Sequence, residues 1–194
     1  MLEWSVAAFQ DAAGIASILI AAPPGEEEKA RELAAKAGGD APVEVVAGGA
    51  HRSESVAAAV AKVETGLVAV HDAARPLVSA ALIDAVLAEL AADEEIQAVV
   101  AAVPLSDTIK EIRRDMEVER TLDRSSLWSA QTPQAFRTEA LRRALESTEL
   151  LAQATDDAML LERLGERVVL HEASPENLKV TTQADLRIAE LLLG

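Results

Sequence analysis

The stretch 67–76 joins a short apolar strand to a charged loop. Residues 67–70 read Leu-Val-Ala-Val, a run typical of a buried strand in a parallel sheet. Asp72 and Arg75 follow it, and in open α/β sheets ligands bind at the carboxyl ends of strands. An aspartate and an arginine so placed could hold a metal ion and a phosphate. The alternative is a turn aspartate in a local salt bridge.

A second loop has the sequence Gly48-Gly49-Ala50-His51-Arg52-Ser53-Glu54-Ser55 and separates a predicted strand from a predicted helix. Glycines let backbone N–H groups approach a ligand closely, and the start of a helix favours anions. Gly-Gly turns are common, so this loop alone is a weak indication of a ligand site.

Alternating strands and helices must position both loops. Strands are predicted over residues 17–21, 43–47, 67–70 and 98–103, and helices over residues 2–13, 26–37, 53–63 and 80–91. This alternation is typical of βαβ units. We therefore predict an α/β fold, with a mainly parallel, Rossmann-like sheet flanked by helices.

The segment 104–124 breaks this alternation. Two short stretches of alternating residues flank a polar Arg113-Arg114-Asp115 turn, which predicts a hairpin that projects from the sheet. An exposed hairpin is marginal alone, so we expect it to pack on a second subunit. Further strands are predicted over 127–130 and 168–171, and helices over 138–145, 156–164 and 183–193. Because no linker or repeat is visible, we expect a single domain over 1–194.

The composition excludes several classes of function. The net charge is −15, and Trp and Phe together number four, which argues against a nucleic-acid surface. Cysteine is absent, which excludes thiolate metal sites, and His51, His71 and His171 lack the spacing of a zinc helix. No apolar run reaches about 18 residues and no signal peptide is visible, so we expect no membrane span and a cytoplasmic location.

Six motifs follow one another along the chain. They are G-G-x-x-R-x-x-S from Gly48, H-D-A-A-R-P from His71, P-x-x-D-T-x-K from Pro104, D-R-x-x-L-W-x-A-x-T-P-Q-x-F from Asp123, T-D-D from Thr155 and E-N-x-K-V-T from Glu176. In this order they resemble the 2-C-methyl-D-erythritol 4-phosphate cytidylyltransferases of the non-mevalonate isoprenoid pathway. The resemblance extends from Leu2 to the end of the chain.

The resemblance implies that a cytidylyl group passes from CTP to methylerythritol phosphate, with release of pyrophosphate and with magnesium as cofactor. The acceptor phosphate attacks the α-phosphorus in line, so the protein's task is positioning and charge neutralisation. Catalytic roles are implied for Lys179, Asp72 and Arg75, and Asp72 is the implied magnesium ligand. Nucleotide contacts are implied for Gly48, Gly49, Ala50, Ser55, Asp72 and Ala73, and acceptor contacts for Thr108, Arg124, Thr132 and Thr155.

Some of these positions have structural alternatives. Thr155 could cap a helix, Arg124 could be an exposed hairpin residue, and Arg52 could serve as a structural support. His71 is expected to support its loop by hydrogen bonding. Thr108 lies in the predicted hairpin, so the resemblance implies that it serves the neighbouring subunit's site in a homodimer formed through this arm.

One family feature has no counterpart in residues 1–194. Family members open with a strand and a glycine-rich loop, L-x-A-G-x-G-x-R, whose backbone amides wrap the triphosphate. We therefore expect that a preceding segment is missing and that the first, central strand of the sheet is absent. Two alternatives stay open: a cytidylyltransferase for another polyol phosphate, such as ribitol phosphate, and a truncated nucleotide-binding dimer without catalysis.

Overall fold

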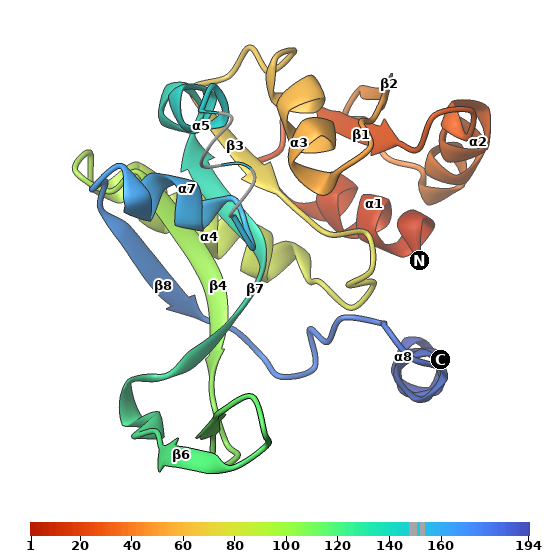
Figure 1. Ribbon diagram of the computed structural model, residues 1–194. Coiled ribbons are helices and arrows are strands. Elements are labelled where there is room, and N and C mark those ends of the chain that lie inside the picture. The colour runs from red at the N-terminus through yellow and green to blue at the C-terminus, as the bar shows by residue number, and fades with distance from the viewer. Residues whose placement is uncertain (148–150, 152–153) are drawn as a thin grey trace.

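The computed structural model describes residues 1–147, 151 and 154–194 (Figure 1). The helices are α1 (Leu2–Asp11), α2 (Glu27–Ala37), α3 (Arg52–Val60), α4 (Ala80–Ala92), α5 (Thr138–Leu145), α7 (Ala158–Arg163) and α8 (Gln183–Leu193), with a 3₁₀ helix η1 (Arg124–Ser126). The strands are β1 (Ile18–Ala22), β2 (Val43–Ala47), β3 (Leu67–Val70), β4 (Ala98–Pro104), β5 (Lys110–Ile112), β6 (Val118–Thr121), β7 (Trp128–Arg137) and β8 (Val168–Glu172). Apart from β7, these bounds lie within a few residues of the predicted ones.

A four-stranded sheet in the order β3-β7-β4-β8 forms the centre of the molecule. Strands β4 and β8 are parallel, whereas β7 runs antiparallel to both β3 and β4. The predicted α/β class is confirmed, and the sheet combines parallel and antiparallel pairs. β7 extends to Arg137 although the sequence predicts a strand only over 127–130. Pro133, which favours the end of a strand, lies where the β4–β7 register shifts between Val100 and Ala102, so pairing resumes beyond it.

Strands β1 and β2 form a separate parallel pair, and β1 is not hydrogen-bonded to β3. A cavity of about 1130 Å³ lies between β1 and β3 and is also lined by α1, α3 and α4. The sheet therefore has the central gap that the sequence predicts. Among the described strands β3 pairs with β7 alone, so one of its edges is unpaired there, and its four residues are half-buried. The cavity extends to His71 and Asp72, directly after β3.

Helices cover both faces of the four-stranded sheet. On one face Val86 of α4 packs against Val99 of β4. On the other face Leu161 of α7 belongs to the cluster around Phe136 of β7, together with side chains of α5. Because β4 is buried on both faces, it reads as a continuous apolar run. This double-sided core fixes β7, the strand next to β3.

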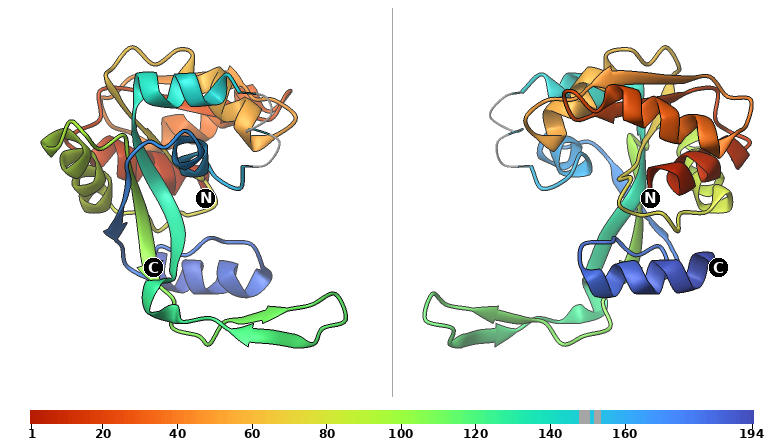
Figure 2. Two further views of the ribbon diagram at one scale, coloured as in Figure 1. Left: turned by 60° about the vertical axis from the view of Figure 1, so that its left-hand side comes forward. Right: turned by 90° about the vertical axis from the view of Figure 1, so that its right-hand side faces the viewer.

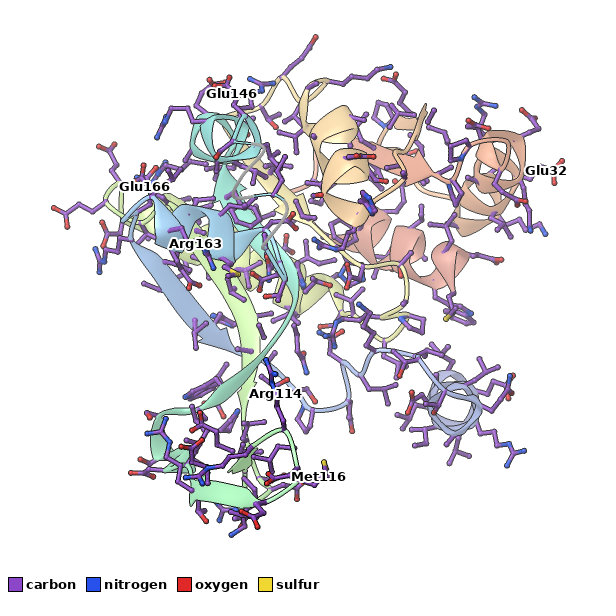
Figure 3. The ribbon with its side chains drawn as sticks, viewed as in Figure 1. Glu32, Arg114, Met116, Glu146, Arg163 and Glu166 are labelled. Carbon is purple, nitrogen blue, oxygen red and sulfur yellow. The ribbon has the colours of Figure 1, made fainter. Side chains whose placement is uncertain are left out.

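Strands β5 and β6 form an antiparallel hairpin that extends away from the body, which confirms the projecting arm (Figure 2). Met116 in its turn is 75% exposed and has a φ of +66°, and Figure 3 labels it beside Arg114 on this arm. Helix α8 also lies apart from the sheet (Figure 1). In the part of the chain that the structure describes, no helix is long and apolar enough to cross a membrane.

Candidate active site

Two cations meet the carboxylate of Asp72, which comes two residues after the end of β3. Lys179 Nζ donates to Oδ2 at 2.8 Å, and Arg52 Nε donates to Oδ1 at 3.0 Å. Burial raises the pKa of this carboxyl group, but Lys179 and Arg52 outweigh burial and leave the pKa of Asp72 below its usual value. Asp72 is therefore an anion at neutral pH, and each of its oxygens contacts a cation.

Thr132 of the neighbouring strand β7 fixes the loop after β3. Its hydroxyl accepts a hydrogen bond of 3.0 Å from the Asp72 amide and lies 3.0 Å from His71 Nδ1. His71 Nε2 lies 3.2 Å from the Arg75 carbonyl, and because a carbonyl only accepts, Nε2 carries the proton. Burial lowers the pKa of His71 to about 4, so the ring is neutral at pH 7. His71 thus supports its loop by hydrogen bonding, as expected.

Arg75 links the same loop to the segment that carries Lys179. Its Nη1 donates to the Asn177 carbonyl at 2.8 Å, and the Asn177 side chain donates to Gln131 Oε1 and the Thr132 carbonyl at 2.8 and 2.9 Å. Burial lowers the pKa of Arg75. Its Nε is buried and has no hydrogen-bond partner among the described residues. An unpaired donor on a half-buried guanidinium suits an anionic ligand.

The Gly48-Gly49 turn between β2 and α3 has no room for larger residues. A Cβ on Gly48 would lie 2.7 Å from Ser55 Oγ, and one on Gly49 would lie 2.3 Å from Glu54 Cβ. The Gly49 amide donates to Ser55 Oγ at 3.1 Å, and the Ala50 amide donates to Glu54 Oε2 at 2.7 Å. The Gly49 and Ala50 amides of this loop are thus paired with side chains of the helix start that follows.

Arg52 also contacts a second carboxylate, which the sequence prediction missed. Its Nη1 lies 2.7 Å from Asp157 Oδ2, and the Asp157 side chain is 2% exposed. Burial raises the pKa of Asp157, although Arg52 opposes this shift. Asp157 lies in the T-D-D motif directly before α7. The available signal was an arginine in the first turn of a helix, where the helix dipole disfavours a cation and a carboxylate partner is needed.

The structure gathers some of the predicted site residues and leaves others apart. Those brought together are Asp72, Arg75, Thr132 and Lys179. Ala73 is exposed in the same loop. Thr155 Oγ1 contacts Met159 Sδ at 3.6 Å, and its suggested role as the cap of α7 is wrong because Asp156 Oδ1 accepts from the Met159 amide.

Two further predicted residues belong to the projecting arm. Thr108 is exposed just before β5, and Arg124 lies in η1, where its guanidinium donates to the carbonyl of Ser106. The arm points away from the body of its own chain (Figure 2). No described hydrogen bond or ion pair links either residue to Asp72.

Asp72 offers one carboxylate to a metal ion. Among the described residues, no group of three or more His, Cys, Asp or Glu gathers as a metal cage. Mg²⁺ is usually held by one or two carboxylates together with substrate phosphates. The residues present therefore fit a magnesium ion shared with a triphosphate, and they do not fit an all-protein metal centre.

Comparisons with known proteins agree along the whole chain. The family model described as 2-C-methyl-D-erythritol 4-phosphate cytidylyltransferase matches residues 1–194. The chain is 44% identical over 200 residues to the enzyme of that name from Symbiobacterium thermophilum, covering 100% of this chain and 80% of the relative. It is 41% identical to the Synechococcus elongatus enzyme of that name, covering 100% of this chain and 83% of that relative.

Solved structures give the same result. The crystal structure of the enzyme of that name from Thermus thermophilus has a TM-score of 0.81 and 36% identity, covering 99% of this chain and 88% of that one. The 4-diphosphocytidyl-2C-methyl-D-erythritol synthase from Anaerococcus prevotii has a TM-score of 0.87 and 28% identity at the same coverage.

Proposed function

Because this chain belongs to the 2-C-methyl-D-erythritol 4-phosphate cytidylyltransferase family, we propose that the residues around Asp72 perform that family's reaction. The chain is a nucleotidyltransferase that moves a cytidylyl group from CTP to 2-C-methyl-D-erythritol 4-phosphate, a step of non-mevalonate isoprenoid synthesis. The comparisons support neither a ribitol phosphate enzyme nor a dimer without catalysis.

One observation carries the assignment of the site. Lys179 and Asp72 are separated by 107 positions in sequence, yet they form a 2.8 Å charge-assisted contact at the carboxyl end of β3. Arg75 lies in the same loop with an unpaired, buried Nε. Cations gathered at a strand end suit a triphosphate, whose charges they neutralise, and the carboxylate beside them suits a metal ion bound to it.

The proposed reaction is an in-line displacement. A phosphate oxygen of the acceptor forms a bond to the α-phosphorus of CTP, and the bond from this phosphorus to the oxygen bridging to the β-phosphorus breaks, so pyrophosphate leaves. The attacking phosphate is already anionic, so no side chain has to remove a proton. Lys179 and Arg75 would neutralise charge on the phosphoryl oxygens as the transition state forms.

Enzymes of this family generally depend on a divalent metal. We propose that Asp72 is the protein ligand of a magnesium ion that is otherwise held by the triphosphate. When bound, this ion would neutralise phosphate charge. Asp72 Oδ2 would then exchange its contact with Lys179 for one with the metal–nucleotide complex, which would free the lysine for a phosphate oxygen.

The nucleotide base and ribose would bind at the Gly48-Gly49 loop and along the strand-end loop that carries Ala73. Packing against Ser55 and Glu54 requires glycine at both positions, and the missing Cβ atoms leave the loop backbone open to a ligand. Ala50 and Ser55 would contribute an amide and a hydroxyl to the same subsite. Thr132 and Thr155 would line the acceptor side, Thr132 chiefly by holding Asp72 in place.

The arm supports a homodimer in which each subunit completes its partner's site. Thr108 and Arg124 lie on a hairpin that points away from its own Asp72 (Figure 2), and the hairpin exposes Ile112, Met116 and Val118. A hairpin of this kind is marginal alone, so burial of its apolar residues against a second copy would stabilise it. We propose that Thr108 and Arg124 bind the acceptor phosphate in the partner's site. The proposed location is the cytoplasm, and no nucleic-acid or membrane partner is proposed.

Mixing two inactive variants tests the shared site. Asp72→Asn disables the body and Arg124→Ala disables the arm, so a mixed dimer contains one site with neither defect. Mixing the variants in equal amounts should restore about a quarter of the wild-type activity, because half of the dimers are mixed and each has one intact site. No recovery in mixtures that exchange subunits would contradict the shared site.

Product formation with two acceptors tests the substrate assignment. The chain, in excess over CTP, is incubated with magnesium and either 2-C-methyl-D-erythritol 4-phosphate or ribitol 5-phosphate, and cytidylylated products are measured by mass spectrometry. Product should form with 2-C-methyl-D-erythritol 4-phosphate. The rate of product formation with ribitol 5-phosphate should be lower by at least about tenfold, because buried polar groups left unpaired disfavour the wrong acceptor. Equal or faster reaction with ribitol 5-phosphate would contradict the assignment.

A further inference from the structure

The two oxygens of Asp72 are held in unequal ways. Oδ1 contacts Arg52, and the guanidinium of Arg52 also contacts Asp157, whose side chain is 2% exposed. Oδ2 contacts Lys179, whose side chain is 44% exposed and reaches the site from a segment outside any helix or strand. The Arg52 side chain is itself 38% exposed, so both contacts lie near the surface. They differ because Arg52 is tethered to a buried second carboxylate, whereas Asp72 is the one ionic partner described for Lys179.

The contact with Arg52 depends on the shape of arginine. Nε and Nη1 of one guanidinium lie 3.0 and 2.7 Å from two different carboxylates, so the group bridges the end of β3 and the start of α7. A lysine ammonium is a single point of charge and lacks this fixed fork. Arg52 is also the first residue of α3, where the helix dipole disfavours a cation, so its position there depends on these two partners.

A purely structural role for the Arg52–Asp157 pair makes a different prediction from a role in positioning. Removing one partner of a buried ion pair destabilises a protein whether or not the pair has a second role, so binding must be measured beside stability. If the pair only holds α3 and α7 together, Asp157→Asn should change stability and leave nucleotide binding as it was. If the pair fixes Asp72, the same change should alter metal–nucleotide binding, even in a fully folded protein.

We propose that Arg52 and Asp157 are positioning residues that fix Asp72 through Oδ1 and present Oδ2 to a metal–nucleotide complex, while Lys179 occupies Oδ2 until that complex binds. This inference rests on the proposed function, because Asp72 is the metal ligand there. It adds two residues that act through Asp72 and do not touch the substrate.

The test measures binding without catalysis, by water proton relaxation with Mn²⁺·CTP as the probe and no acceptor present. Binding of metal-free CTP in EDTA and the melting temperature are measured on the same samples. The variants are Asp72→Asn, Arg52→Lys and Asp157→Asn. Arg143→Lys is the matched control, since Arg143 pairs with Glu166 at 3.2 Å on the surface of α5.

Arg52→Lys and Asp157→Asn should each raise the Kd for Mn²⁺·CTP by about tenfold or more, as for other residues that orient a metal ligand. Affinity for metal-free CTP should stay close to wild type. The loss of one ion-pair partner lowers the melting temperature, which is used to confirm that each variant is folded at the assay temperature. A variant that carries both Arg52→Lys and Asp157→Asn should have about the same Kd for Mn²⁺·CTP as the weaker-binding single variant, because the two residues act as one unit. Arg143→Lys should change none of these values.

Two variants separate positioning from simple charge. Mn²⁺·CTP carries a net negative charge, so removing the nearby Asp157 carboxylate should strengthen its binding if only charge matters. Arg52→Lys keeps the positive charge and should change nothing on the same assumption. We expect both variants to raise the Kd for Mn²⁺·CTP, and an Asp157→Asn variant that binds Mn²⁺·CTP as tightly as wild type, or more tightly, would overturn the proposal.

The Asp72→Asn variant separates failure of this proposal from failure of the proposed function. If Asp72→Asn weakens Mn²⁺·CTP binding but Arg52→Lys and Asp157→Asn do not, the positioning role is wrong and Asp72 remains the metal ligand. If Asp72→Asn has no effect on Mn²⁺·CTP, the metal assignment under the proposed function fails, and the positioning proposal fails with it.

Discussion

The hydroxyl of Thr132 on β7 accepts a hydrogen bond of 3.0 Å from the backbone amide of Asp72, 60 residues earlier in the chain. The same hydroxyl lies 3.0 Å from His71 Nδ1. One buried side chain of β7 therefore sets both the backbone and the imidazole of the loop that carries Asp72. The position of Asp72 depends on β7 as much as on β3.

Thr132→Val should weaken both stability and turnover. Valine has nearly the same shape, but it leaves the Asp72 amide without its acceptor, and an unsatisfied buried donor costs about 1–3 kcal/mol. We expect a loss of stability of this size by chemical denaturation and a lower kcat. Thr132→Ser keeps the hydroxyl and should retain most of the activity. Equal activity of the serine and valine variants would contradict the role given to this hydroxyl.

His71 should make the folded protein sensitive to mild acid. Burial lowers its pKa from 6.5 to about 4 in the folded state, so below pH 6.5 the unfolded chain takes up a proton that the folded chain does not. The stability that depends on neutral His71 is therefore fully present above pH 6.5 and is lost as the pH falls towards 4. Its loss lowers the free energy of unfolding by about 3 kcal/mol at most.

Comparing wild type with His71→Gln isolates that contribution. Denaturant unfolding at pH 7 and pH 5 should show the stability difference between the two proteins narrowing by about 2 kcal/mol, because glutamine does not titrate. Stability curves that stay parallel between these pH values would show that the ring is not buried as a neutral group.

Phe136 should be among the most costly core residues to truncate. It is fully buried on β7 in the cluster that joins β7 to α5 and α7. Phe136→Ala should lower the free energy of unfolding by about 3–5 kcal/mol, measured by denaturant titration. Leu191→Ala on α8 is the control, since Leu191 is 82% exposed and surface changes stay within about 0.5 kcal/mol. Similar losses in both variants would contradict the described core.

The local pattern of apolar and polar residues predicted the α/β class and most helices and strands. It failed where pairing with segments far away in the chain decides the structure. Residues 80–91 have apolar side chains on one helical face, and α4 follows this prediction closely. β7 was predicted too short because Pro133 favours the end of a strand. Pairing with both β3 and β4 overrides this preference, and no local pattern reports such pairing.

The candidate site was predictable only in part for the same reason. Asp72, Arg75 and Lys179 belong to motifs that can be read in order along the chain, and the structure brings them together. The link between Arg52 and Asp157 joins two helix starts that are 105 positions apart, and a single sequence gives no indication that they meet. The roles of Thr108 and Arg124 depend on a second subunit, so they stay predictions.

The most direct test of the site is a single-turnover experiment that compares wild type with Asp72→Asn. The chain, in excess over CTP, is mixed with magnesium and 2-C-methyl-D-erythritol 4-phosphate, and release of pyrophosphate is followed over hours so that slow chemistry is also detected. We predict that wild type releases pyrophosphate together with the cytidylylated product, and that Asp72→Asn is slower by at least about 100-fold. Equal rates in the two proteins, or no product from the folded wild-type chain, would contradict the claim that this site transfers the cytidylyl group.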